Sequence, residues 1–348
     1  MASVFVLRKE YKSSERRTPL TPENAKKLID QGHTVKIEKC PDRIFKDSEY
    51  LDVGCMLIPE NSWPKEDKNV FILGLKELPV DDFPLIHRHI YFAHIYKGQT
   101  GFEKVIKRYT DGGGKHFDLE YLVGEDKRRV AAFGKWAGFT GAAISLDRYY
   151  QKQSGSSYPP LKSFENIEEL FTQISENKKK STTHPTAMII GALGRCGSGA
   201  KEVFDHFNIK TTLWDFEETK KGGPFLEITN HDIFINCVLM TTKIPPFITR
   251  ELLENNKNLS VIGDVSCDPT SDLNPIPIYD DITNWEVPFL ETCGLELLAV
   301  DNLPSVLPRE SSIDFSDQLI EHILNLANIG EEDYVWNASL EVFKKHSP

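Results

Sequence analysis

The chain has 348 residues, of which 40% are hydrophobic and 27% are charged, and its formal net charge is −11. This length suits two domains of ordinary size, each with its own hydrophobic core. The acidic balance disfavours a nucleic-acid binder, which would carry a basic stripe. No apolar run approaches the roughly 18 residues that a membrane span needs, so we expect no membrane-spanning segment.

The chain ends and the cysteines indicate a cytoplasmic protein. Residues 1–7 lead directly into a strand-like run and lack the features of a signal peptide. The C-terminus carries no peroxisomal tripeptide. The six cysteines show no paired CxxC spacing, so we expect reduced thiols and no metal site.

Strands and helices alternate in the first third of the chain. The first predicted helix has Thr21 as its N-cap, Pro22 at its first position and Gly32 just beyond its end. A second helix is expected at 102–109. The predicted strands are residues 3–7, 33–39, 70–75, 90–95 and 117–122. This alternation predicts an α/β fold with a parallel sheet and helices on both of its faces.

A long segment, residues 131–153, separates this part from a second alternation of the same kind. It is small and apolar at first and then amphipathic, which predicts a closely packed helix that connects two domains. A surface helix at 165–177 and a polar linker follow it, and a last helix is expected at 314–328. The strands predicted between them are residues 187–190, 211–214, 232–237 and 259–264.

The strand at 187–190 runs into a glycine-rich loop that is typical of dinucleotide sites. Gly191, Gly194 and Gly197 would allow a tight turn and let the main chain approach a pyrophosphate. The helix that follows would direct its free N–H groups and positive dipole end at the phosphates. Arg195 is a further candidate for contact with the phosphates.

An acidic residue is expected about 20 residues further on, at the tip of the next strand, where it holds the ribose hydroxyls. Asp215 lies at that place and favours NAD over NADP, and Lys221 is a weaker candidate for a ribose or adenine contact. The first two glycines are spaced GxxG instead of the usual GxG. The glycines alone would also fit an ordinary strand–helix turn that needs small residues.

Three polar clusters follow strand-like runs in the first half of the chain. They are Lys76 with Glu77, His94 with Lys97, and Glu120 with the pair at 128–129. Ligands of open α/β sheets bind outside the carboxyl ends of the strands. Lys76 and His94 are therefore predicted to lie at the same ligand-binding crevice. A lysine and a histidine there could exchange protons near neutral pH. Each also has a structural interpretation, as a solvated strand end or a core histidine, and the pattern alone leaves the chemistry open.

A series of motifs covers nearly the whole chain: 15–22 (ERRTPLTP) with the preceding 8–10 (RKE), 74–79 (GLKELP), 92–97 (FAHIYK), 118–120 (DLE), 128–134 (RRVAAFG), 190–199 (IGALGRCGSG), 222–225 (GGPF), 232–237 (DIFINC), 274–278 (NPIPI) and 301–310 (DNLPSVLPRE). These motifs resemble the superfamily of alanine dehydrogenase and nicotinamide transhydrogenase, and within it the fungal-type saccharopine dehydrogenases that form lysine with NAD.

This resemblance implies a reaction and an architecture. Saccharopine, NAD and water would give lysine, 2-oxoglutarate and NADH through an imine and a carbinolamine, as the last step of lysine synthesis by the α-aminoadipate route. The fold would be two Rossmann-like, doubly wound parallel-sheet domains with the active site in the cleft between them. The catalytic domain would be residues 1–132, completed by 318–348, and the NAD domain residues 133–317. The resemblance also suggests a monomer.

The resemblance further implies roles for individual residues. Lys76 would take the proton of the secondary amine, and His94 would act as the acid–base group for water attack, with Glu77 and Glu120 adjusting their pKa values. Arg17 and Arg129 would hold substrate carboxylates, which suits a planar, bidentate donor. Other implied contacts are Lys97 and Phe133 with the substrate, Asp301 near the nicotinamide, Cys237 with the cofactor, and a disulfide between Cys196 and Cys237.

Two other functions are compatible with these residues. A related dehydrogenase acting on alanine or another opine-like imine could use Arg17, Lys76 and His94 equally well. Arg129 and the acidic pair Glu77 and Glu120 favour a larger, dicarboxylate substrate, and thus saccharopine. A protein that binds NAD as a sensor without catalysis is the other alternative, and the intact Lys76 and His94 argue against it.

Overall fold

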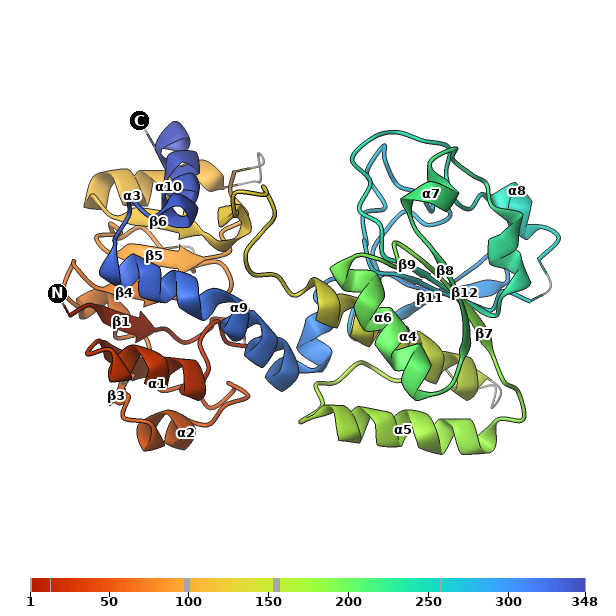
Figure 1. The fold of residues 1–348 in the computed structure, drawn as a ribbon, viewed down its shortest axis with the longest axis horizontal. Coiled ribbons are helices and arrows are strands. Elements are labelled where there is room, and N and C mark those ends of the chain that lie inside the picture. Colours follow the sequence, from red (N-terminus) through yellow and green to blue (C-terminus); the bar gives the residue numbers. More distant parts are fainter. Residues whose placement is uncertain are drawn as a thin grey trace. The chain divides into compact units, whose positions relative to one another are not determined.

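The computed structural model describes residues 2–12, 14–79, 81–96, 101–152, 157–256 and 258–347. The chain forms two compact units, and each contains one sheet (Figure 1). The first unit combines Met1–Ala132 with the C-terminal segment Pro308–Pro348, and the second is Phe133–Leu307. The chain thus rejoins the first unit at Pro308, where a helix begins, and not at residue 318 as predicted from the sequence.

The first unit is built on a six-stranded sheet in which all the pairs are parallel. Its strands are β1 (Val4–Leu7), β2 (Thr34–Glu38), β3 (Met56–Ile58), β4 (Phe71–Leu73), β5 (Arg88–Tyr91) and β6 (Lys115–Asp118). The order β3-β2-β1-β4-β5-β6 places β1 between β2 and β4. The chain therefore runs away from β1 in opposite directions, and the carboxyl ends of β1 and β4 form the switch point at which such sheets bind ligands.

Two helices from the C-terminal segment, α9 (Pro308–Asn328) and α10 (Tyr334–His346), complete the first unit. The other helices of this unit are α1 (Pro22–Asp30), α2 (Asp47–Asp52), η1 (Trp63–Lys65), α3 (Phe102–Gly112) and η2 (Leu119–Tyr121). Helix α9 is tied to α1 by a hydrogen bond from the Asn24 side chain to Ser316 at 2.8 Å. Helix α10 packs on β6, with the Trp336 ring edge-on to Phe117 at 5.6 Å. These contacts explain why the C-terminal segment groups with the first unit.

The second unit also has a six-stranded sheet, in the order β11-β12-β10-β9-β7-β8. Its strands are β7 (Thr186–Ile190), β8 (Lys210–Trp214), β9 (Ile233–Asn236), β10 (Val261–Asp264), β11 (Phe289–Thr292) and β12 (Leu295–Leu298). The pairs are parallel except for the antiparallel edge strand β11. Alternate residues of β7 enter separate cores, Ile189 on one face and Met188 on the other. Strand β7 lies between β8 and β9, so its carboxyl end is the switch point of this sheet.

Close helix packing explains the small residues that precede the amphipathic part of the long connecting helix. The helices of the second unit are α4 (Gly134–Lys152), α5 (Ile167–Lys180), α6 (Arg195–His206), α7 (Phe216–Thr219), η3 (Leu226–Asn230), α8 (Arg250–Leu253) and η4 (Leu303–Val306). A Cβ at Gly138 would lie 1.8 Å from the main-chain oxygen of Cys196, and one at Gly199 would lie 2.0 Å from that of Lys135. Helices α4 and α6 can therefore touch only because these positions are glycine.

The fold class predicted from the sequence is confirmed, and the differences concern element ends and several elements that were not predicted. The expected strand at 90–95 stops at Tyr91, so His94 lies beyond it, and Glu120 lies in η2 and not in a strand. Helix α9 begins at Pro308 instead of residue 314. The elements α2, β3, α7, α8, β11, β12 and α10 had no counterpart in the prediction. In the described part of the chain, no helix has the length and apolar character needed to cross a bilayer.

Candidate active site

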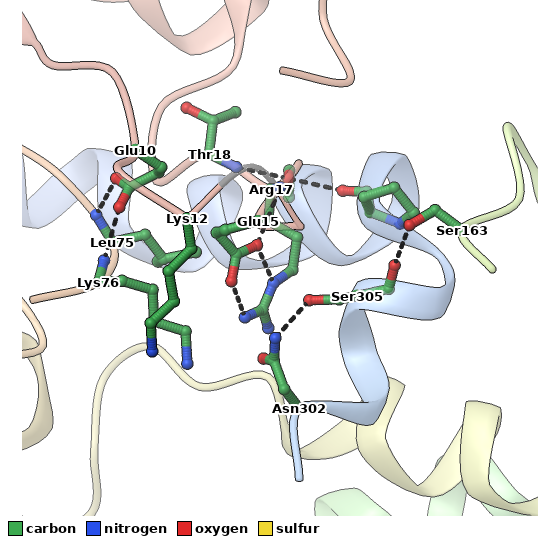
Figure 2. A network of polar contacts seen from close by, with 12 residues as sticks. Glu10, Lys12, Glu15, Arg17, Thr18, Leu75, Lys76, Ser163, Asn302 and Ser305 are labelled. Carbon is green, nitrogen blue, oxygen red and sulfur yellow. Dashed lines mark hydrogen bonds and ion pairs between the residues drawn. The ribbon is translucent and has the colours of Figure 1, made fainter. Parts of the chain in front are cut away.

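The loop after β4 carries Lys76 and is held by buried charged side chains that follow β1. The Glu10 carboxylate accepts hydrogen bonds from the main-chain N–H groups of Leu75 at 2.6 Å and Lys76 at 3.0 Å (Figure 2). The Arg8 guanidinium donates to the main-chain oxygen of Lys76 and pairs with Glu10 at 3.3 Å. These contacts fix the main chain of Lys76 at the switch point, and Figure 2 shows its side chain extending alongside that of Lys12.

His94 and Glu77 form a hydrogen-bonded pair beyond the ends of β5 and β4. Nδ1 of His94 lies 2.6 Å from Oε1 of Glu77, and this bond raises the pKa of His94 against the effect of burial. Burial also acts on Glu77, where it raises the pKa. The hydrogen bond to His94 and the nearby charges, including that of Lys12 at 3.7 Å, outweigh it and lower the pKa of Glu77 to about 2. Glu77 is therefore an anion at neutral pH that stabilises the protonated imidazole.

Lys76 and Glu120 act on the same imidazole. The positive charge of Lys76 lowers the pKa of His94, and the negative charge of Glu120 raises it. Glu120 lies in η2, and its main-chain N–H donates to Oδ1 of Asp118 at 2.9 Å. Burial raises the pKa of Asp118 to about 6. The structure thus brings the four predicted acid–base residues into one region of the first unit, together with a buried carboxyl group.

A cavity of about 700 Å³ adjoins this group and has Glu77 and His94 in its wall. The rest of the wall is largely apolar and includes Leu78, Pro79, Tyr91, Ala93, Ile95 and Val105. This volume lies in the range of pockets that bind small molecules. The acid–base group therefore borders a space of suitable size for a substrate.

The residues predicted to bind substrate carboxylates differ in their surroundings. Arg17 forms a buried, two-point ion pair with Glu15, from Nε at 2.8 Å and from Nη2 at 2.6 Å. A substrate carboxylate would have to use another edge of this guanidinium. Arg129 is exposed, and Phe133 is partly exposed and begins the second unit. Lys97 lies outside the described residues.

In the second unit, the glycine loop lies at the switch point after β7. Gly191 has φ +85°, and a Cβ there would meet the main-chain oxygen of Cys237 at 2.9 Å. A Cβ at Gly197 would lie 2.2 Å from the main-chain oxygen of Gly191, so the loop can close onto α6 only over a glycine. Gly194, the N-cap of α6, has only one neighbouring atom near, at 3.5 Å. This open side and the helix N-terminus leave room for a pyrophosphate, and Arg195 is exposed beside it.

Asp215 connects the tip of β8 to the glycine loop. Its Oδ2 accepts from the main-chain N–H of Leu193 at 2.8 Å, and its Oδ1 accepts from that of Phe216 at 2.8 Å. Glu218 accepts from the main-chain N–H of Asp215, also at 2.8 Å. Two carboxylates at this tip repel a 2′-phosphate and suit ribose hydroxyls, so the residues present fit NAD.

A second cavity, of about 400 Å³, begins at Asp215. Its wall is mostly apolar and includes Phe216, Val238, Leu239, Met240, Ile244 and Phe247. A planar adenine ring would fit between such side chains. Lys220, not the predicted Lys221, contributes to this wall, and Lys221 is exposed.

The expected disulfide is not supported by the structure. All six cysteines have free thiols, including Cys196 and Cys237. Burial and the neighbouring Cys196 thiol raise the pKa of Cys237, which disfavours the thiolate that oxidation requires. Asp301 is exposed directly before η4. Among the described residues, no group of three or more His, Cys, Asp or Glu side chains could hold a metal ion.

Three buried charged residues near the site had no predicted role of their own. Arg8 and Glu10 follow the first strand, and Asp118 ends the last strand of the same sheet. For Arg8 and Glu10, the position just after the predicted strand at 3–7 was the available signal, whereas Asp118 lay near the start of the predicted strand at 117–122. Their partners, however, are main-chain groups far away in the sequence, which no local pattern reveals.

A Rossmann-type nucleotide loop in one unit and an acid–base group in the other define the class of two-domain NAD-dependent dehydrogenases. Two family models match in chain order, "Alanine dehydrogenase/PNT, N-terminal domain" at residues 6–140 and "Alanine dehydrogenase/PNT, C-terminal domain" at residues 186–342. An L-alanine dehydrogenase structure has the same fold, with a TM-score of 0.68 at 17% identity, over 98% of this chain and 94% of that chain.

Curated relatives narrow the class. The saccharopine dehydrogenase (NAD(+), L-lysine-forming) of Yarrowia lipolytica is 44% identical over 98% of this chain and 96% of its own length. The protein of the same name from Neurospora crassa is 42% identical, over 98% and 95% respectively. The chain therefore belongs to the saccharopine dehydrogenase (NAD(+), L-lysine-forming) family.

Proposed function

We propose that the protein oxidises saccharopine with NAD and water to L-lysine, 2-oxoglutarate and NADH, as the last step of lysine biosynthesis through α-aminoadipate. The observation that carries the proposal is the group formed by Lys76 and the His94–Glu77 pair beside a cavity. The reaction needs one base for the amine and one acid–base group for water. The names of the relatives supply the substrate. We also expect a monomer in the cytoplasm, as predicted from the sequence.

The second unit would hold NAD, which when bound accepts a hydride from the carbon that carries the secondary amine. Gly191, Gly194 and the N-terminus of α6 would face the pyrophosphate. Asp215 would accept hydrogen bonds from the ribose, and the apolar cavity beside it would take the adenine. Asp301 would lie near the nicotinamide.

In the first unit, Lys76 would act as the base for the amine. It takes the proton of the secondary amine nitrogen as the hydride leaves the adjacent carbon, and a carbon–nitrogen double bond forms. The bonds from Glu10 and Arg8 to the main chain of Lys76 keep its side chain at the switch point. Arg17, Arg129, Lys97 and Phe133 would orient the substrate and its carboxylates.

His94 would serve the hydrolysis of the imine. It takes a proton from water as the oxygen bonds to the imine carbon, while Lys76 returns its proton to the nitrogen, and the carbinolamine results. His94 then gives its proton to the nitrogen as the carbon–nitrogen bond breaks, and the hydroxyl group passes its proton to Lys76 as it becomes the carbonyl of 2-oxoglutarate, so that lysine and 2-oxoglutarate are released. A histidine that alternates between its two forms needs a pKa near the operating pH, and the opposing charges of Glu77, Glu120 and Lys76 supply that adjustment.

The test is NADH absorbance after the protein is mixed with NAD and saccharopine, with L-alanine in a parallel reaction. We expect NADH with saccharopine and not with alanine. Lys76→Met and His94→Gln should each lower kcat by roughly 100-fold or more, the usual contribution of a general acid or base. Lys39→Met is the matched control, because Lys39 is an exposed lysine at the end of β2 in the same sheet.

Each outcome has a clear meaning. NADH with alanine instead of saccharopine would move the protein to the alanine dehydrogenase branch. No NADH with either substrate, while NAD still binds, would support a sensor. Equal losses in Lys76→Met and Lys39→Met would remove Lys76 from the catalytic group.

A further inference from the structure

Asp118 is a buried carboxylate that the proposed reaction does not use. It ends β6, is 1% exposed, and lies between the two segments that carry His94 and Glu120. Its Oδ1 accepts from the main-chain N–H of Glu120 at 2.9 Å, and its Oδ2 accepts from that of Ala93 at 3.4 Å. One carboxylate therefore bonds to the residue before His94 and to Glu120 at the same time.

The turn that carries His94 needs such support. His94 has φ +52°, in the left-handed region that side chains other than glycine rarely adopt. A conformation of this kind persists only where the surrounding structure enforces it. On the β4 side, the main-chain N–H of Phe92 donates to the Leu75 oxygen at 3.2 Å. On the β6 side, the bond from Ala93 to Asp118 is the corresponding restraint.

We propose that Asp118 is a positioning residue of the active site, which holds the His94 turn and η2 in place so that the His94 imidazole keeps its hydrogen bond to Glu77. This inference rests on the proposed function for the catalytic role of His94. Its structural content, that Asp118 sets the geometry of the His94–Glu77 pair, can be measured without a substrate. Asp118 does not itself line the cavity, but it bonds to Ala93, which does, and so it would act through the His94 turn.

A simpler role would be the capping of η2, because the Asp118 side chain is also the N-cap of that helix. The substitution Asp118→Asn distinguishes the capping of η2 from the support of the His94 turn. The asparagine oxygen can still accept from Glu120, the shorter of the two bonds, but its NH2 group then faces the Ala93 N–H. Two donors cannot bond to each other, so this substitution removes the restraint on the His94 turn and keeps the cap.

The measurement is an NMR titration of the His94 ring in the full-length protein without ligands, with His94→Gln for assignment. The charged groups that face this ring are Glu77, Lys76, Glu120 and, more weakly, Asp118. If Asp118 acts through geometry, Asp118→Asn weakens the bond to Glu77, and the pKa of His94 falls toward its ordinary value. In a Glu77→Gln background, where this ion-paired bond is already gone, Asp118→Asn should cause no further fall.

The double-mutant comparison separates geometry from simple charge. An equal fall in both backgrounds would mean that Asp118 acts on His94 only as a nearby charge, and this would overturn the proposal. No fall in either background would reduce Asp118 to a helix cap. If the double variant does not fold, the His94 tautomer in Asp118→Asn decides the question, because loss of the Glu77 bond frees Nδ1–H whereas a mere charge change leaves the tautomer as it is.

Ser339→Ala is the matched control for stability. The Ser339 hydroxyl donates to the main-chain oxygen of Asp118 at 3.0 Å, from α10. Its removal loosens the same segment without touching the carboxylate, so the melting temperature should fall while the titration of His94 stays unchanged. In the activity assay we expect Asp118→Asn to lower kcat about tenfold with KM little changed. If the wild type did not oxidise saccharopine, only the kcat comparison would lose its meaning. The titration of His94 would still decide the proposal.

Discussion

The two units have the same kind of switch point but build it from different groups. In the second unit, the loop after β7 consists of glycines whose main chain turns tightly and leaves one side open. In the first unit, the loops after β1 and β4 are joined by buried side-chain charges, chiefly Arg8 and Glu10. A Cβ at Gly74, directly after β4, would meet the Arg8 guanidinium, whereas one at Gly197 would meet main-chain atoms.

This difference follows from what each loop has to do. Main-chain N–H groups are fixed, neutral dipoles that can hold a phosphate but cannot take up a proton at neutral pH. Amines, imidazoles and carboxylates can, and their pKa values respond to neighbouring charges. Changes in the glycine loop should therefore act on NAD binding, and changes in the charged loops should act on the chemical steps.

The largest effect is expected at Gly197. In Gly197→Ala the new methyl group would lie 2.2 Å from the main-chain oxygen of Gly191 and 2.5 Å from Cα of Ala192, so main-chain atoms must move. We expect the Kd for NAD to rise about 100-fold, which corresponds to roughly 3 kcal/mol, together with a lower melting temperature of the free protein. Calorimetric titration with NAD measures the first effect.

Gly194→Ala is the comparison for this variant. Its Cβ would have ordinary space, with one atom at 3.5 Å, so the free protein should keep its melting temperature. A weaker affinity for NAD would then report contact with the cofactor itself. If Gly197→Ala bound NAD as well as the wild type, the assignment of the loop to the pyrophosphate would be wrong.

A smaller effect, confined to chemistry, is expected at Glu10. Glu10→Gln keeps the size of the side chain but turns an NH2 group toward one of the two N–H donors of the Lys76 loop. Losing a hydrogen bond to a buried charge costs about 1.5–3 kcal/mol, so we expect kcat to fall roughly 10- to 100-fold. The Kd for NAD should not change, because the second unit is untouched.

Glu60→Gln is the matched control, since Glu60 is an exposed carboxylate of the same unit that pairs with Lys9 at 2.8 Å. It should leave kcat within about twofold of the wild type. Parallel losses of NAD affinity and kcat in Glu10→Gln would show that the two switch points do not act separately.

The comparison also explains which parts of the site could be predicted from the sequence. A loop that binds phosphate through its main chain needs glycine at fixed positions. The nucleotide loop, Asp215 and the strands around them can therefore be predicted from the local sequence pattern. The charged site depends on pairs such as Glu10 with Leu75, and Asp118 with Ala93, whose members come together only in the folded sheet. Roles for Lys76 and His94 therefore came from family resemblance. Glu10 and Asp118 lie in motifs of that family, but no local pattern indicated the main-chain groups to which they bond.

Element ends were missed where polar side chains have tertiary partners. The apolar periodicity of α9 becomes evident only from Phe315, although the helix begins at Pro308. Its first turns carry Ser311 and Ser312, which are fully buried. The Ser312 hydroxyl accepts from the main-chain N–H of Thr18. Similarly, β6 ends at Asp118 because that side chain caps η2, so Glu120 leaves the predicted strand.

The smallest expected effect concerns the free energy of unfolding at acid pH. The two units should differ in this property as well. Among the described residues, the fully or nearly fully buried histidines belong to the first unit, and His89 and His116 have no exposed surface. Neither ring nitrogen of His89 has a hydrogen-bond partner in the described structure, and Trp63 lies edge-on at 5.0 Å. Burial holds the pKa of His89 well below 6.5.

The sign of the pH dependence follows from this direction. As the pH falls below 6.5, the unfolded chain binds a proton at His89 before the folded protein does. The stability that depends on a neutral imidazole is therefore fully present well above pH 6.5. It is lost progressively as the pH falls through and below 6.5, by about 1.4 kcal/mol near pH 5.5. His89→Phe should reduce the difference between the urea midpoints measured at about pH 7.5 and pH 5.5. The opposite contribution of Asp118, whose pKa is raised by burial, is common to both proteins and cancels. An unchanged difference would mean that His89 already has a partner able to hold its proton, and acid sensitivity would then have to arise elsewhere in the chain.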